Sequence, residues 1–235
     1  MGCCASRELP LKKQLQEETL GKKEMASETA SLSYLPLETI QDSKALEIYN
    51  YVKQLSNWET VIAEDWLTIK KLDSSQYSKD YPVTYATITF DSVVPFQTFL
   101  EQLNTPETRL KWDPNIKQLE TKTLSQGTYL QYRLVSTFGY KGDFVEKRFI
   151  AKDQDKLVQV FFSEPNEDYP EQKGLRRGSV LMGYHEFSHQ HGKTIFKIIS
   201  QIDINHTLGK MLAKLGPKKY KDWCKLVFKR INSVS

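Results

Sequence analysis

Cysteine and long apolar runs are both scarce in this sequence. Its 235 residues include only 3 Cys, and two of these, Cys3 and Cys4, are adjacent, a spacing unsuited to a disulfide-stapled fold. The uninterrupted apolar runs are only a few residues long, far below the ~18 residues that a membrane-spanning helix needs. We therefore expect neither a disulfide scaffold nor a transmembrane helix.

Signals for secretion and for common catalytic loops are also missing. The first residues, MGCCASRELPLKK, lack the apolar stretch of a secretory signal, so we expect the chain on the cytosolic side with reduced thiols. The sequence contains neither the G-x-S-x-G element of a serine hydrolase nor a phosphate-binding glycine loop. The third cysteine, Cys224, stands in a helical pattern and fits a buried small hydrophobe better than a nucleophile.

The composition suits a globular domain, with 39% hydrophobic and 26% charged residues. The net charge of +4 is too small to indicate a nucleic-acid partner, and we expect none. Basic residues nevertheless gather in residues 207–235, where eight Lys or Arg stand against one acid. This segment is either the solvated face of an amphipathic helix or a surface that contacts an anionic membrane. In the second case the candidate contacts are Lys214, Lys218 and Lys219.

The N-terminus carries a candidate lipidation signal. Residues 1–6 fit the N-myristoylation pattern M-G-x-x-x-[ST], which places the acyl group on Gly2. One myristoyl chain binds membranes only marginally, and Cys3 and Cys4 offer thiols for a second, palmitoyl anchor. The alternative is an accidental match, which the paired cysteines argue against. We predict a flexible acylated tether over residues 1–42, which would hold a domain of residues 43–235 at the cytoplasmic face of a membrane, with the plasma membrane favoured.

The periodicity of the remaining chain predicts an α+β fold. Amphipathic spacing indicates a helix over residues 43–57, shorter helices near residues 95 and 106, and a long helix from Thr207. Strand-like alternation separates these helices, and we expect a curved antiparallel sheet of about eight or nine strands closed around the C-terminal helix. The apolar even positions of residues 128–135 are expected to line an interior, which is either solid or hollow. The predicted strands are 66–71, 83–91, 116–124, 128–138, 143–151, 157–163, 176–190 and 193–203.

The order of several motifs resembles the START (steroidogenic-acute-regulatory-related lipid transfer) family over about residues 43–233. One departure is Gly142, where the family usually has Arg. The matching elements are Trp66, the R-L-K-W-D run at 109–113, the G-D-F-V-E-K-R strand at 142–148, the G-L-R start at 174–176 and the strand-to-helix passage at 203–223.

This resemblance implies a helix-grip fold whose hydrophobic tunnel holds one lipid under the C-terminal helix, without catalysis and without a cofactor. A phospholipid is the favoured ligand and a sterol the alternative, and we expect a monomer. In the phosphatidylcholine-binding branch, the arginine matching Arg109 meets the lipid phosphate and the aspartate matching Asp113 pairs with it. A surface Arg–Asp pair is the structural alternative. Arg148 of the strand motif is a further candidate ligand contact.

The same branch encloses choline in three aromatic rings. Alignment strand by strand places two of these positions on Tyr132 and Phe144 and the third near Leu181, which is not aromatic. Aromatic faces attract a quaternary ammonium, but both rings could equally be core residues.

A rival motif, His185-Glu186-Phe187-Ser188-His189, matches the zinc-protease pattern H-E-x-x-H. That motif requires a helix, whereas its surroundings predict a strand, in which residues four apart are separated by about 13 Å. We therefore expect no metal site. The function predicted is lipid binding and transfer. A membrane-tethered sensor or adaptor with an unknown protein partner is the alternative, and an enzyme on a related fold is the least favoured.

Overall fold

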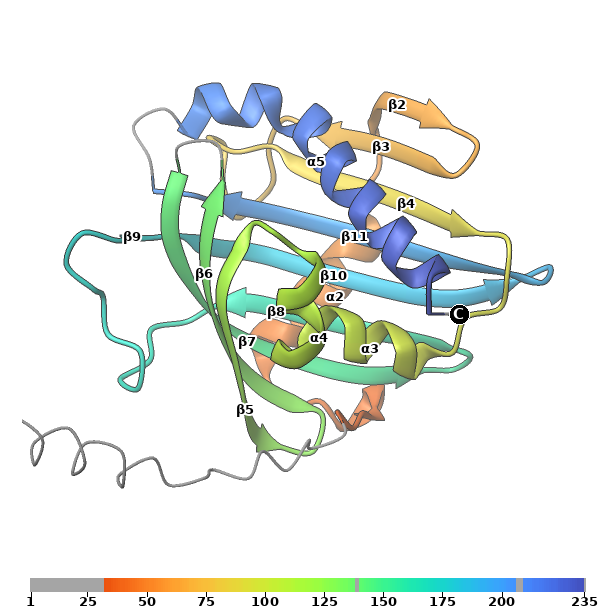
Figure 1. The fold of residues 1–235 in the computed structure, drawn as a ribbon, viewed down its shortest axis with the longest axis horizontal. Coiled ribbons are helices and arrows are strands. Elements are labelled where there is room, and N and C mark those ends of the chain that lie inside the picture. Colours follow the sequence, from red (N-terminus) through yellow and green to blue (C-terminus); the bar gives the residue numbers. More distant parts are fainter. Residues whose placement is uncertain (1–31, 138–139, 206–208, 235) are drawn as a thin grey trace, which may run out of the picture. The chain divides into compact units, whose positions relative to one another are not determined.

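A computed structural model describes residues 32–137, 140–205 and 209–234, with side chains in the last range from Lys219 onward. Figure 1 shows a curved sheet with helices on both faces. The strands are β1 (Leu35–Pro36), β2 (Glu59–Glu64), β3 (Leu67–Leu72), β4 (Val83–Phe90), β5 (Ile116–Ser125), β6 (Thr128–Thr137), β7 (Tyr140–Asp153), β8 (Lys156–Ser163), β9 (Arg176–Arg177), β10 (Ser179–Gln190) and β11 (Lys193–Asp203).

The main sheet has the order β2-β3-β4-β11-β10-β8-β7-β6-β5. Neighbours along this path are antiparallel, and the short strands β1 and β9 pair in parallel with β7. The last strand, β11, lies between β4 and β10, so it joins the three strands β2–β4 to the strands β5–β8 and β10 that follow them in the sequence. The helices are the 3-10 turn η1 (Leu37–Thr39) and the α-helices α2 (Ser43–Gln54), α3 (Phe96–Asn104), α4 (Pro106–Trp112) and α5 (Gly209–Asn232).

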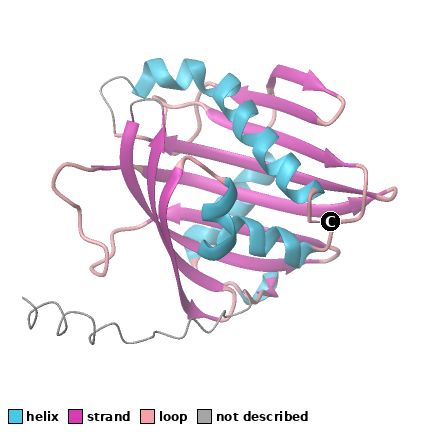
Figure 2. Ribbon diagram, in the orientation of Figure 1, coloured by secondary structure: helices cyan, strands magenta, loops and turns pink. Residues whose placement is uncertain are grey.

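Helices cover both faces of the central strands. In Figure 2, α3, α4 and α5 lie on the near side of the sheet and α2 lies behind it. One apolar cluster, with Ile88, Phe196 and Val227, joins the sheet to α3 and α5. A second cluster, with Ile48 and Val160, joins the opposite face to α2. Because apolar layers cover both faces, the central strands β8 and β10 are buried along most of their length.

The compact unit begins at Leu32, before the boundary predicted at residue 43. Leu32 and Ile40 are buried, and β1 pairs with β7, so residues 32–42 pack against the sheet. Asp42 caps α2 by accepting a hydrogen bond from the Ala45 amide at 3.0 Å, and it also pairs with Lys147 of β7 at 2.8 Å. The apolar residues of this segment follow neither a helical nor a strand period, so the pattern did not reveal this packing. The predicted tether of residues 1–31 lies outside the described residues.

The predicted α+β class and curved antiparallel sheet are confirmed. The sequence analysis missed β2, whose ETVIAE segment is largely exposed and therefore lacks clear alternation. It also placed Trp66 in a strand, whereas Trp66 lies in the turn before β3 and packs its ring at 4.8 Å from that of Phe228 in α5. Among the described residues, no helix combines the length and apolarity needed to span a bilayer.

A glycine on β10 allows an aromatic ring to lie directly on the sheet. A Cβ added at Gly183 would overlap the Phe161 ring on β8. We expect Gly183→Ala to lower the free energy of unfolding by about 1–3 kcal/mol, the usual cost of overpacking, as measured by urea denaturation. The control Thr123→Ala, at an exposed position of β5, should change stability by less than about 0.5 kcal/mol. An equal effect of the two substitutions would contradict this account of Gly183.

Candidate functional site

A cavity of about 330 Å³ lies between the concave face of the sheet and the C-terminal helix α5. Its lining combines apolar and aromatic residues with polar and charged ones. The apolar and aromatic residues are Leu103, Ile116, Val135, Phe161, Ile198, Ile202, Tyr220 and Trp223. The polar residues are Arg109, Asp113, Asn115, Gln131, Arg133, Thr137, Arg148, His185, Ser200 and Lys219.

Arg109 and Asp113 form a buried ion pair at the end of α4. Their i,i+4 spacing brings the side chains together, and Arg109 donates to Asp113 Oδ2 from Nε at 3.0 Å and from Nη2 at 2.7 Å. Arg109 Nη1 also donates to the Leu103 carbonyl at 3.2 Å. Trp223 of α5 donates from Nε1 to the same Asp113 oxygen at 3.1 Å. Asp113 therefore ties α5 to α4 at the edge of the cavity.

Burial and neighbouring arginines destabilise the charge of Arg109. Its pKa is lowered to about 10, first by burial and further by repulsion from Arg133 and Arg148, although Asp113 opposes the shift. At neutral pH the guanidinium is still charged. Arg133 and Arg148 therefore both repel the positive charge of Arg109 at this cavity.

A second charged cluster centres on Glu146, whose side chain is fully buried. Glu146 and Arg148 alternate onto the same face of β7, and Arg148 Nε donates to Glu146 Oε2 at 3.0 Å. From β6, Arg133 Nη2 reaches Glu146 Oε1 at 2.5 Å. Burial alone would raise the pKa of Glu146, but the two guanidinium groups outweigh it and lower the pKa. Glu146 is thus a carboxylate shared by two arginines.

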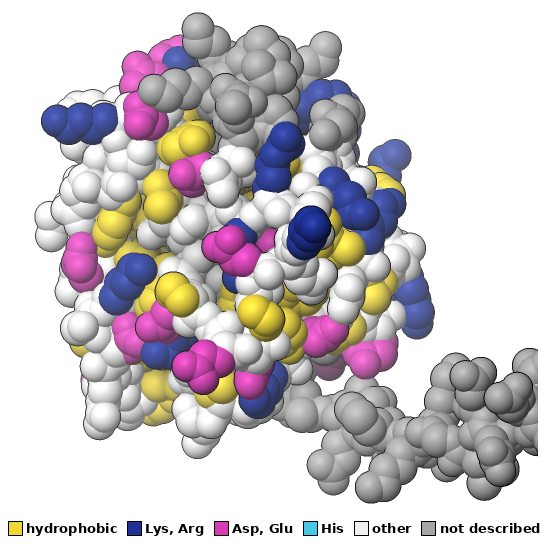
Figure 3. Space-filling model, turned by 90° about the vertical axis from the view of Figure 1, so that its left-hand side faces the viewer, with side chains coloured by type: hydrophobic (Ala, Val, Ile, Leu, Met, Phe, Trp, Pro, Cys, Tyr) yellow, Lys and Arg dark blue, Asp and Glu magenta, His cyan; other side chains and the backbone are white. Residues whose placement is uncertain are grey.

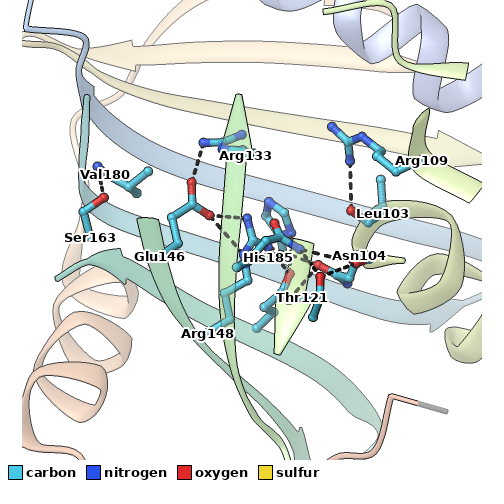
Figure 4. A network of polar contacts seen from close by, with 12 residues as sticks. Leu103, Asn104, Arg109, Thr121, Arg133, Glu146, Arg148, Ser163, Val180 and His185 are labelled. Carbon is cyan, nitrogen blue, oxygen red and sulfur yellow. Dashed lines mark hydrogen bonds and ion pairs between the residues drawn. The ribbon is translucent and has the colours of Figure 1, made fainter. Parts of the chain in front are cut away.

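The cluster extends through neutral polar groups, drawn in Figure 4. Arg148 Nη1 donates to Asn104 Oδ1 at 3.1 Å and to Gln159 Oε1 at 3.2 Å, and Gln159 Nε2 donates to Asn104 Oδ1 at 3.1 Å. His185 Nδ1 lies 3.1 Å from Gln159 Oε1. Since that oxygen can only accept, His185 carries its proton on Nδ1 and leaves Nε2 as an acceptor.

His185 is held in its neutral form. Its pKa lies well below the ordinary value, first because of burial and then because of the positive charge of Arg148, Arg109 and Arg133. The imidazole lines the cavity, so it offers a fixed acceptor beside three cations. His185 belongs to the H-E-x-x-H motif, which lies on strand β10 as its surroundings indicated.

Some of the predicted ligand-binding residues line the cavity and others do not. Arg109, Asp113 and Arg148 all line the cavity, as does the exposed Lys219. Leu181 is half-buried at an irregularity of β10 and is not part of the lining. The predicted acylation sites Gly2, Cys3 and Cys4 and the side chains of Lys214 and Lys218 lie outside the described residues.

The structure does not bring Tyr132 and Phe144 together on one face of the sheet, as the predicted aromatic cage requires. In the β6–β7 register, Tyr132 pairs with Val145 and Arg133 pairs with Phe144, so the two aromatic rings lie on opposite faces of the sheet. Tyr132 stacks on Tyr169 at 5.0 Å, away from the cavity. Phe144 lies on the cavity side, with its ring centroid 4.7 Å from the Arg133 guanidinium.

Sequence analysis also missed more than half of the polar residues that line the cavity. It expected the apolar even positions of β6 to face the interior, but the odd residues Gln131, Arg133 and Val135 line the cavity. The even residues are covered by the β8–β9 connection through Tyr169. The polar residues Gln131 and Arg133, in an otherwise apolar strand, were the available signal. Asn104 and Gln159 carried no such sequence signal, because a single amide side chain at the end of a helix or within a strand is common.

The neutral His185 gives a testable pH dependence. Because its folded-state pKa lies below the unfolded value of about 6.5, the unfolded chain gains a proton there as the pH falls, and stability declines by up to ~1.4 kcal/mol per pH unit. We expect His185→Asn to lose up to ~2 kcal/mol less stability than the wild type between pH 6.5 and 5, by urea denaturation. The control His191→Asn, in the exposed β10–β11 turn, should follow the wild type. Parallel curves for all three proteins would exclude a neutral buried His185.

Comparison with known proteins agrees with this architecture. No curated protein matches the chain significantly. Human STARD10 matches at a TM-score of 0.71 with 15% identity, over 82% of this chain and 80% of that one. Human StAR-related lipid transfer protein 5 matches at 0.71 with 12% identity, over 81% and 93%, and the lipid transfer and protein localization domain of human StarD13 at 0.59 with 17%, over 82% and 96%. These likenesses show the fold. The START domain family itself matches residues 41–217, and the chain is therefore a member of the START domain family.

Proposed function

We propose that this protein holds one lipid in the cavity beneath α5 and carries it between membranes. The observation that supports this proposal is the mixed lining of the cavity, which offers both apolar contacts for the chain of an amphiphile and polar partners for its head. The protein with the same fold named StAR-related lipid transfer protein 5 supports the same assignment. No step in this function requires a catalytic group.

The size of the cavity indicates how a lipid would enter. Its volume of about 330 Å³ is at the lower end of the roughly 300–1,000 Å³ of small-molecule sites, so a lipid with two long chains needs additional space. Polar contacts hold α5 over the cavity, from Trp223 to Asp113 and from Arg230 Nε to Gln102 Oε1 at 2.8 Å. We propose that α5 moves away from the sheet to admit the ligand. The two hydrogen bonds would stabilise the closed position and break when the helix moves.

A phospholipid is the favoured ligand and a sterol the alternative. Guanidinium groups complement phosphate, and both Arg109 and Arg148 line the cavity. Arg109 already donates to Asp113 and Leu103, so the assignment of phosphate to Arg109 competes with a purely structural role for this pair. Preference for choline has lost its support, because Tyr132 faces away from the cavity.

Membrane attachment is the second part of the proposal and rests on the N-terminal sequence. Gly2 with Cys3 and Cys4 would give two kinds of acyl anchor at the cytoplasmic face of a membrane. On the face drawn in Figure 3, basic and acidic side chains are interspersed with apolar ones, so this face presents no uniform positive field. The basic residues of the C-terminal segment 207–235 are our candidates for attraction to anionic lipids.

A sensor or adaptor acting through a protein partner is the competing function. Both functions need the cavity, but only transfer requires the bound lipid to leave quickly on contact with a second membrane. Movement of lipid between donor and acceptor vesicles, measured with the whole chain, separates the two.

Filling the cavity tests lipid binding directly. Val135 lines the cavity, while its neighbour Leu134 packs on the opposite face, and both are half-buried. We expect Val135→Trp to reduce lipid transfer between vesicles, and the bound lipid seen by native mass spectrometry, at least tenfold. The matched control Leu134→Trp should retain both, with circular dichroism confirming the fold of each variant. Unchanged transfer by folded Val135→Trp would refute a lipid site in this cavity.

Removing the acyl acceptors tests the anchor. Gly2→Ala should abolish acylation and shift the protein to the soluble fraction of cells, because the first chain is needed before the second can be added. Cys3→Ser combined with Cys4→Ser should leave the marginal association of a single myristoyl chain, on the order of 10⁴ M⁻¹. Mass spectrometry of the purified N-terminus identifies the modifications. Undiminished membrane fractionation of Gly2→Ala would contradict the proposed anchor.

A further inference from the structure

The ionised side chains of the cavity do not balance. Arg109 is neutralised by Asp113 in a one-to-one pair. Arg133 and Arg148, however, share the single carboxylate of Glu146. Three guanidinium groups are thus matched by two carboxylates, which leaves one excess positive charge among these five side chains, and Lys219 adds a further cation to the lining of the cavity.

Arg133 is the arginine with unused donors. Its Nη2 pairs with Glu146, but its Nε is buried without a hydrogen-bond partner, and Nη1 has none among the described residues. Arg148, by contrast, uses Nε, Nη1 and Nη2 on Glu146, Asn104 and Gln159. The side chain of Arg133 keeps 18% of its surface exposed and lines the cavity, and because Nε is buried, Nη1 is the donor that a ligand would reach.

We propose, on the basis of the lipid-binding function above, that the cavity selects a lipid with an anionic terminal group and that Arg133 is the residue that binds this group. A buried cation without a counter-charge is costly, and an anionic head would restore the balance. Carboxylate and phosphate share the required chemistry, since both accept paired hydrogen bonds from a guanidinium. Uncharged lipids of equal length would bury the same chain without this gain.

Arg133→Gln is a clean test of this assignment. It leaves Arg148 and Glu146 as a balanced pair, so the cluster loses its excess charge without stranding a carboxylate. Arg133→Lys keeps the charge but not the planar fork. The control Lys141→Gln removes one positive charge from an exposed position of the adjacent strand β7. Circular dichroism and urea denaturation verify that each full-length variant is folded.

The ligands form two matched pairs with the same oleoyl or oleyl chain. Oleate is compared with oleyl alcohol, and 1-oleoyl lysophosphatidate with 1-oleoylglycerol, by isothermal titration calorimetry below their aggregation concentrations. We expect the wild type and Lys141→Gln to bind at least one anionic lipid tenfold or more tightly than its uncharged partner. Arg133→Gln should reduce this preference below threefold, and Arg133→Lys should retain part of it.

The outcomes separate this inference from the proposed function. Preference for both anions supports a general anionic head, and preference for lysophosphatidate alone supports a phosphate head. Equal binding of charged and uncharged partners, or a preference that persists in Arg133→Gln, overturns the inference while lipid binding stands. Failure of all four lipids to bind, together with no transfer between vesicles, overturns the proposed function and this inference with it.

Discussion

The buried carboxylate of Glu146 is the interaction on which the site depends. It has no exposed surface, and its charge is stabilised by the ion pair of Oε1 with Arg133 and by hydrogen bonds from Arg148 to Oε2. Arg148 in turn reaches Asn104 at the end of α3 and Gln159 on β8, and Gln159 meets His185 on β10. One charge therefore positions side chains from four strands and a helix, and it fixes the tautomer of the histidine among them.

Asp113 is the carboxylate that connects helix α5, which lies over the cavity, to helix α4. It accepts hydrogen bonds from Arg109 on α4 and from Trp223 on α5 at a single oxygen. The guanidinium of Arg109 also lies 4.6 Å from the ring centroid of Trp112 and 5.5 Å from that of Trp223. These contacts couple the position of α5 to the charge state of one end of the cavity. A displacement of the helix would leave Asp113 with one partner fewer but still paired, which keeps the cost of opening moderate.

The fold was largely predictable from the sequence, whereas the site was predictable only in part. Apolar alternation in β4, β10 and β11 identifies strands whatever their neighbours are, and the Arg109–Asp113 spacing brings its own pair together. Which face of β6 lines the cavity depends on the β8–β9 connection, whose Tyr169 covers the apolar even residues. That contact joins distant segments and has no local signal. The aromatic cage could not be assigned from the sequence for a similar reason. The register of β6 against β7 decides whether Tyr132 and Phe144 share a face, and this register has no local signal.

The presence of both apolar and charged groups in the cavity lining has a consequence for selectivity. Folding alone assembles the charged cluster, since its partners are protein side chains, so a ligand does not have to order these groups when it binds. The apolar lining residues contribute in proportion to the length of lipid chain that is buried, about 0.8 kcal/mol for each CH₂ group, and they do so for any lipid of sufficient length. Discrimination between lipids of equal chain length must therefore come from the head group at the charged cluster. There, adding or removing one formal charge changes the electrostatic balance, while the number of apolar contacts stays the same.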